Sequence, residues 1–115
     1  MIEAMKATKL NLKQNPTLAD IQQYVTELEL ERGFDQNTIL EKYLLLTEEM
    51  GELAKCIRKN ASSVRVDIAK EYDFDTAAEF ADVLLVLCAL ANRLGVDLEQ
   101  AFRDKEEVNK QRTWQ

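Results

Sequence analysis

Two short acidic patterns in the sequence have the residue types and the spacing of a metal site. Glu79 and Asp82 lie three positions apart, as do Glu49 and Glu52, and Glu48 directly precedes the second pair. On an α-helix, residues three apart share a face, one turn from each other. Carboxylates that meet in an apolar setting repel unless a cation neutralises them. Two such pairs on facing helices would form an all-oxygen site of the kind that Mg²⁺ prefers.

The setting of Glu79 and Asp82 favours this interpretation over its alternative. They fall in the most apolar segment, residues 76–94, which reads TAAEFADVLLVLCALANRL. A helix that is hydrophobic on nearly all faces is typically buried. The alternative is that Glu48, Glu49 and Glu52 are ordinary surface charges, since Glu is mostly exposed. A bound Mg²⁺ would hold a substrate phosphate and activate a water, so the pattern predicts hydrolysis or transfer at a phosphate ester or anhydride.

A third set of polar residues lies near the end of the chain. Lys105, Asn109 and Arg112 are separated by four and three positions, which places them on one stripe of a final helix. An ammonium, an amide and a guanidinium together form a good phosphate clamp. The alternative is a solvated helix whose basic residues suit its dipole. Phe34 and Trp114, in a connection and in the tail, are the candidates for stacking on a nucleobase.

Hydrophobic periodicity predicts four helices that must position these residues, and therefore an all-α bundle. We expect helices over about 17–33, 38–60 and 76–95 and from 97 into the tail, with residues 1–16 as a loosely ordered leader to a domain over 17–115. Tyr43 fits the apolar stripe of the second helix and is expected in the core. Ala101, Phe102, Lys105 and Val108 are expected to face inward. Residues 61–75 are the least regular part of the chain, and within them residues 64–72 could form a short helix or an extended lid.

The expected helix ends carry recognisable capping residues. Thr17, with Asp20 three residues later, suits the start of the first helix, and Gly33 suits a left-handed end. Asn37 or Thr38 would begin the second helix, Asp75 or Thr76 the third, and Asp97 the fourth. The third helix is too apolar for four helices alone to cover, so we expect a second copy of the chain to complete its core.

Composition excludes several classes of function. The chain has 115 residues, 46% apolar and 31% charged, which is typical of one globular domain. A formal net charge of −6 disfavours nucleic-acid and anionic-membrane partners. The apolar run 83–91 is too short to span a bilayer, and the first residues lack the apolar run of a signal peptide, so we expect a cytoplasmic protein. Cys56 and Cys88 fit reduced core positions, and the lack of His removes the usual zinc ligands.

These patterns together resemble the MazG-type nucleoside triphosphate pyrophosphohydrolases. That family carries E-E-x-x-E followed by E-x-x-D, which this chain matches with Glu48, Glu49 and Glu52 and then Glu79 and Asp82. The text LTEEMGELAK resembles the family's first motif, and Lys105, Asn109 and Arg112 match its later Lys, Asn and Arg. The resemblance extends over about residues 17–114.

The resemblance implies an Mg²⁺-dependent hydrolase, with Mn²⁺ as a substitute, that cleaves nucleoside triphosphates between the α and β phosphates in nucleotide-pool house-cleaning. Glu49, Glu52, Glu79 and Asp82 would then hold the metal, and Glu48 would be a second-metal ligand or a base. The basic stripe would contact phosphates, in a homodimer or homotetramer. The alternative functions are a non-catalytic helical oligomerisation protein and a nucleotide sensor without turnover.

Overall fold

The computed structural model describes residues 7–65, 67 and 75–115, which form four α-helices and no strand. The helices are α1 (Leu18–Arg32), α2 (Ile39–Ala61), α3 (Thr76–Arg93) and α4 (Leu98–Asn109), and a 3-10 turn, η1 (Phe34–Gln36), joins α1 to α2. The all-α prediction and its four helices are confirmed. Most of the predicted helix or lid in 64–72 lies outside the described residues.

Local side-chain chemistry sets the helix boundaries. Thr17 and Asp20 form a reciprocal capping box at the start of α1, and Thr38 and Glu41 form a second one at the start of α2. Asp75 and Asp97 cap α3 and α4 through one backbone N–H each. Gly33 ends α1 in the left-handed region, at φ 78°, a conformation that glycine adopts without strain.

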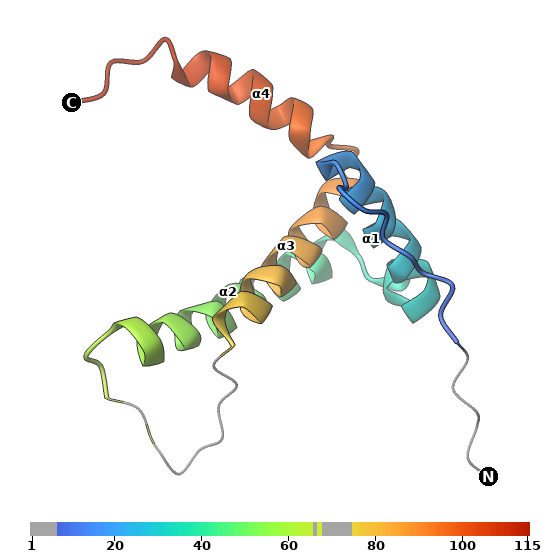
Figure 1. Cartoon of the computed structure of the whole chain (residues 1–115), viewed down its shortest axis with the longest axis horizontal. Coiled ribbons are helices and arrows are strands. Elements are labelled where there is room, and N and C mark those ends of the chain that lie inside the picture. Colours follow the sequence, from blue (N-terminus) through green and yellow to red (C-terminus); the bar gives the residue numbers. More distant parts are fainter. Residues whose placement is uncertain (1–6, 66, 68–74) are drawn as a thin grey trace.

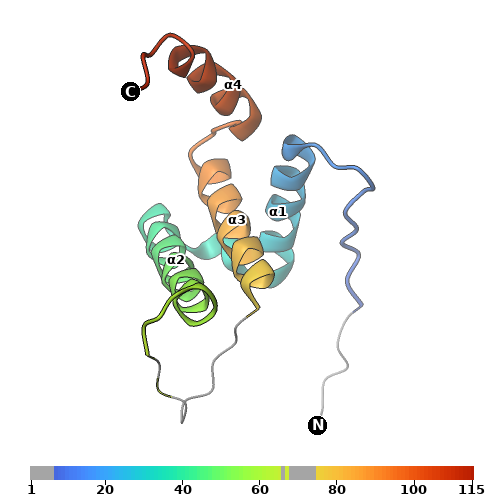
Figure 2. The ribbon, with the colours of Figure 1, turned by 60° about the vertical axis from the view of Figure 1, so that its left-hand side comes forward.

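α3 is the central element and packs between two neighbours. Figure 2 shows α2 on one side of α3 and α1 on the other. α2 and α3 run antiparallel (Figure 1), and the amide of Asn60 at the end of α2 donates to the hydroxyl of Thr76 at the start of α3, at 3.1 Å. The core lies between α1 and α3, and its buried members are Val25, Leu28, Cys88 and Ala89. Leu10, in the expected leader, packs against this core.

α4 leaves the three packed helices and projects away from α2 and α3 (Figure 1). The radius of gyration is 17.8 Å, against about 13 Å for a compact domain of this length. The expectation that α4 faces inward was wrong for a single chain, since Ala101, Phe102, Lys105 and Val108 are all exposed, Phe102 at 71%. The reason is the turn at Gly95, with φ 68°, after which α4 packs mainly against α1 among the described elements.

A polar network fixes the point at which α4 departs. The buried side chain of Gln22 on α1 donates to Asn92 Oδ1 at 3.0 Å and to the carbonyl of Val96 at 2.8 Å. Its own Oε1 accepts from the backbone N–H of Leu98 at 3.0 Å, and Asn92 Nδ2 donates to the Gln22 carbonyl at 2.8 Å. Because both amides have partners, the network holds the start of α4 against α1 without an orphaned polar group.

Large apolar side chains remain uncovered along α2 and α3. Tyr43 is 56% exposed, so its expected core position was wrong for a single chain. The exposed apolar residues of these two helices are Ile39, Leu40, Tyr43, Leu44, Leu45, Met50, Ile57, Phe80, Leu84 and Leu87. Surfaces of this extent are typical of protein interfaces. Among the described residues, no helix combines the length and the apolarity that a bilayer crossing requires.

Candidate functional site

Three carboxylates from α2 and α3 meet where the two helices pack. One oxygen each of Glu49, Glu79 and Asp82 lies within 4.8 Å of the other two. Glu79 and Asp82 are one turn apart on α3, and the antiparallel packing brings Glu49 of α2 opposite them. Glu79 is buried, Glu49 is half-buried and Asp82 is exposed, so the cluster opens to solvent on one side.

The negative charges of this cluster favour the binding of a cation. The pKa of Glu49 is raised, first by burial and then by the negative charges of Asp82, Glu79, Glu48 and Glu52. A divalent cation between the oxygens would remove the repulsion that raises it. Mg²⁺ binds oxygens at about 2.1 Å, which places opposite ligands roughly 4.2 Å apart. Neighbouring ligands of the same sphere lie roughly 3 Å apart. Side-chain rotations that draw the three oxygens together would therefore be needed to form it, and the residue types present fit the metal.

The other two predicted acidic residues point elsewhere. Glu52 Oε1 lies 3.4 Å from the ammonium of Lys55, one turn along α2, and is not part of the trio. Glu48 is exposed and lines a separate hollow of about 310 Å³ with Asn37 and Glu41. Both nevertheless stand near enough to raise the pKa of Glu49. The structure thus brings together three of the four predicted metal ligands, and the role of Glu52 stays a prediction.

A cavity of about 460 Å³ adjoins the carboxylates. Glu49 and Asp82 form part of its wall, and Phe34, predicted to stack on a base, lines it as well. Trp114, the other predicted stacking residue, is 73% exposed in the tail and does not line it. The complete lining is Glu29, Arg32, Phe34, Asn37, Lys42, Leu45, Glu49, Asp82, Leu85, Val86 and Ala89.

Sequence reasoning missed a buried ion pair in this cavity. The ammonium of Lys42 on α2 pairs with Glu29 Oε2 on α1 and donates to the carbonyl of Phe34 at 3.0 Å. Lys42 is only 2% exposed. The signal was present, because Lys42 stands with Glu41 between the apolar residues Leu40 and Tyr43, at the start of a helix that is otherwise apolar there. A charge in such a run is as informative as Glu79 and Asp82 in theirs.

The predicted phosphate clamp lies apart from the carboxylates of its own chain. Lys105, Asn109 and Arg112 do not line the cavity of Glu49 and Asp82, and α4 projects away from α2 and α3, which carry those carboxylates (Figure 1). The predicted single helical stripe was wrong for Arg112, because α4 ends at Asn109 and Arg112 lies in the turn beyond it. Asn109 is half-buried, and its Oδ1 is shielded without a hydrogen-bond partner among the described residues. The three residues therefore remain a prediction that requires α4 to meet a site outside its own chain.

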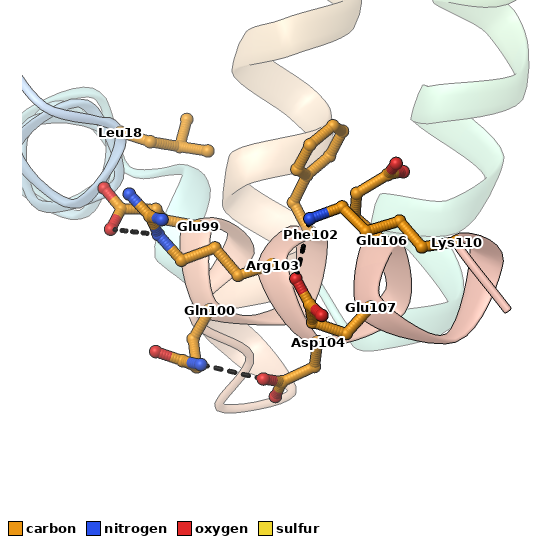
Figure 3. A pocket seen from close by; sticks show the side chains of 9 residues that line it. All are labelled: Leu18, Glu99, Gln100, Phe102, Arg103, Asp104, Glu106, Glu107 and Lys110. Atoms are coloured by element: carbon orange, nitrogen blue, oxygen red, sulfur yellow. Dashed lines mark hydrogen bonds and ion pairs between the residues drawn. The ribbon is translucent and has the colours of Figure 1, made fainter.

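A larger hollow of about 550 Å³ lies along α4, beside Leu18 of α1 (Figure 3). Most of its polar side chains pair with one another. Arg103 Nε lies 3.3 Å from Glu99, Gln100 donates to Asp104 at 2.8 Å, and Lys110 donates to Glu107 at 2.9 Å. Since these side chains satisfy each other, the hollow has no convergent group comparable with the carboxylate cluster.

Comparisons with known proteins agree with this geometry. The MazG nucleotide pyrophosphohydrolase domain matches residues 34–113, a range that includes every predicted site residue except Trp114. The chain is 33% identical over 99 residues to dATP/dGTP diphosphohydrolase of Salmonella phage PMBT28, covering 86% of this chain and 28% of that protein. It is 34% identical over 113 residues to dCTP pyrophosphatase 1 of Mus musculus, covering 96% of this chain and 66% of that protein. The chain thus spans just under two thirds of the length of the mouse relative and 28% of the length of the phage relative.

Two solved structures have the same fold over most of the chain. YPJD from Bacillus subtilis, a candidate pyrophosphatase, matches with a TM-score of 0.70 and 30% identity, over 88% of this chain and 100% of that one. iMazG from Vibrio DAT 722 matches with a TM-score of 0.62 and 35% identity, over 83% of this chain and 99% of that one.

Proposed function

The chain belongs to the MazG nucleotide pyrophosphohydrolase family, and from that premise we propose that it hydrolyses nucleoside triphosphates between the α and β phosphates. The products are the nucleoside monophosphate and pyrophosphate. The observation that carries this proposal is the convergence of Glu49, Glu79 and Asp82 beside a cavity. Dependence on Mg²⁺, with Mn²⁺ as a substitute, is part of the proposal.

The carboxylate trio would hold the metal, and Glu52 would join it by rotating away from Lys55. A bound Mg²⁺ supplies charge neutralisation of the phosphates and lowers the pKa of a coordinated water. Glu48, one residue from Glu49, is proposed as the base for the attacking water or as a ligand of a second metal. The cavity beside the trio would receive the nucleoside, with Phe34 in contact with the base.

A second copy of the chain would complete the site. The uncovered apolar residues of α2 and α3 and the projecting α4 support a homodimer or homotetramer. In such an assembly, α4 of one copy would bring Lys105 and Asn109, and the turn that follows it would bring Arg112, to the carboxylates of the other. Metal and cationic side chains then approach the triphosphate from opposite sides.

The names of the relatives do not agree on a base. One is a dATP/dGTP diphosphohydrolase and the other a dCTP pyrophosphatase, so base preference is not transferred from either. The proposed role is control of the nucleotide pool in the cytoplasm, in which removal of unwanted triphosphates needs no nucleic-acid or membrane partner.

A nucleotide panel tests the proposal. The purified protein is incubated with canonical and modified triphosphates, with Mg²⁺ or with EDTA, and pyrophosphate and monophosphate are quantified. We expect both products in equal amounts and only with metal. Release of inorganic phosphate instead would place the cleavage elsewhere. Tight nucleotide binding without any product would favour a sensor, and no binding at all would leave only a helical oligomerisation protein.

A further inference from the structure

The cavity beside the carboxylates has two chemically different ends. On α2, Lys42, Leu45 and Glu49 follow one another at helical positions i, i+3 and i+7, so they form one stripe along the cavity. Seven residues of helix rise by roughly 10 Å, which separates the ammonium end from the carboxylate end. α3 supplies the facing stripe in the opposite direction, with Asp82, Leu85, Val86 and Ala89.

This length and polarity suit a nucleotide laid along the two helices. Phosphates at Glu49 and Asp82 would leave the sugar over the apolar middle of the stripe. The base would then reach Lys42, Glu29 and Phe34. The separation of the two ends is comparable with the span from the phosphates of a nucleotide through its sugar to the edge of its base.

The base end is built from a buried ion pair and a fastened turn. Lys42 and Glu29 are both buried, and both reach the cavity wall. Lys42 also donates to the Phe34 carbonyl at 3.0 Å, and Arg93 of α3 donates to the carbonyl of Asn37 at 2.5 Å. The turn that carries Phe34 is therefore held from two helices, which keeps the aromatic wall in a constant place.

Stability alone does not explain this pair. The desolvation free energy of two buried charges is about as large as their mutual attraction. Replacing such a pair by apolar residues of similar size therefore often leaves the free energy of unfolding unchanged. The structure shows two hydrogen-bond acceptors for the ammonium of Lys42 in the described residues, Glu29 and the Phe34 carbonyl. An ammonium has three donors and a carboxylate several acceptor positions, so both groups have hydrogen-bonding capacity beyond these contacts.

We propose that Lys42 and Glu29 determine which nucleobase the site accepts, an inference that rests on the proposed function. Lys42 donates its third N–H to a ring nitrogen or carbonyl oxygen of the base, and Glu29 accepts from the neighbouring N–H or amino group. Bases differ in the order and position of these groups along their edges. A fixed donor beside a fixed acceptor therefore distinguishes among them, while Phe34 contacts every base alike.

The test compares base preference in three proteins. These are the wild type, Lys42→Arg, and the double variant Glu29→Leu/Lys42→Met, in which apolar side chains replace both charges so that neither is left buried alone. The kcat and KM are measured with Mg²⁺ for dATP, dGTP, dCTP and dTTP. A hydrogen bond to a charged group is worth roughly tenfold or more in affinity, so we expect the wild type to separate its best and worst bases by at least that ratio.

In the double variant we expect this ratio to fall to about threefold or less, mainly through a higher KM for the best base. Lys42→Arg keeps the positive charge but changes the length and shape of the donor group, so it is expected to change the order in which the four bases are preferred. The matched control is Glu99→Gln/Arg103→Gln, which removes an ion pair on the surface of α4 and should leave the ratio unchanged. Circular dichroism establishes that each variant is folded.

The outcomes separate this inference from the function on which it rests. A folded double variant that keeps the wild-type ratio overturns the inference, as does an equal loss of activity for all four bases, which would make the pair purely structural. A wild type without base preference also overturns it. If the wild type releases no pyrophosphate from any triphosphate, the proposed function fails first and the inference falls with it.

Discussion

Replacing Glu49 by Gln should stabilise the protein without metal and abolish its stabilisation by Mg²⁺. The three clustered carboxylates have oxygens within 4.8 Å of one another, and two unit charges at that separation repel by about 1 kcal/mol in water and roughly 3 kcal/mol at an effective dielectric constant of about 20. Because the cluster opens to solvent, the lower figure applies. Glu49 takes part in two of the three pairs, so its neutralisation should relieve about 2 kcal/mol.

The pH dependence of this gain has a defined sign. The pKa of Glu49 is raised in the folded protein, so the folded state holds its proton more tightly than the unfolded state does. The wild type therefore pays no penalty at Glu49 below the unfolded pKa of about 4.3, and loses stability as the pH rises through the folded value. The difference between Glu49→Gln and wild type should be small at acidic pH and reach its full size near neutrality.

Urea unfolding in EDTA, followed by circular dichroism at a constant protein concentration, measures the difference. Glu27→Gln, at an exposed position of α1, is the control for loss of one negative charge. With Mg²⁺ at a hundredfold excess over its Kd, the wild type should gain about 2.7 kcal/mol and Glu49→Gln much less. A variant that is less stable than wild type in EDTA, yet gains the same stability from Mg²⁺, would refute the placement of the metal.

Four further predictions test other parts of the structure. Asp82→Asn and Glu52→Gln should each lower kcat at least a hundredfold with little change in circular dichroism, and near-wild-type turnover of either would remove it from the ligand set. Thr38→Ala should lower the free energy of unfolding by about 1 kcal/mol through loss of the α2 capping box. In the same box, backbone and side-chain hydrogen bonds from Thr38 lower the pKa of Glu41. The ionised Glu41 therefore stabilises the fold above its unfolded pKa, and this stabilisation is lost as the pH falls through the folded pKa. Glu41→Gln should therefore weaken the fall in the free energy of unfolding at acidic pH, and an unchanged acid dependence would contradict this. Phe80→Glu, on the exposed face of α3, should shift sedimentation towards a single chain, and an unchanged coefficient would contradict an interface there.

The parts of the fold that depend on neighbouring residues were predictable. Thr17, Thr38 and Asp97 cap the helices that follow them because a short polar side chain meets backbone N–H groups two or three residues later. Gly33 ends α1 for an equally local reason, its positive φ. Helical spacing also identified the carboxylates on α2 and α3, because repulsion in an apolar segment is visible from residue types alone.

The position of α4 was not predictable from periodicity. The spacing of Phe102 and Val108 correctly indicates an apolar face, but it does not say which chain covers that face. The turn at Gly95 and the Gln22 network direct α4 away from α2, and neither is visible as a pattern of hydrophobic residues. The rotation of Glu52 towards Lys55 was also not predictable, because a helical stripe determines which face a residue lies on but not its side-chain rotamer.

The buried ion pair of Lys42 was predictable by the same argument that applies to the carboxylates of α2 and α3. Glu79 and Asp82 in an apolar helix predict a compensating cation, and Lys42, beside Glu41 in a largely apolar stretch, equally predicts a buried anion. The same desolvation cost applies to both signs of charge, so Lys42 required an anionic partner, and Glu29 on the preceding helix was available to provide it. Applied to both signs, that rule points to both ends of the cavity together: the carboxylates at Glu49 that are proposed to bind a cation and its phosphates, and the donor and acceptor at Lys42 and Glu29 that are proposed to contact the base.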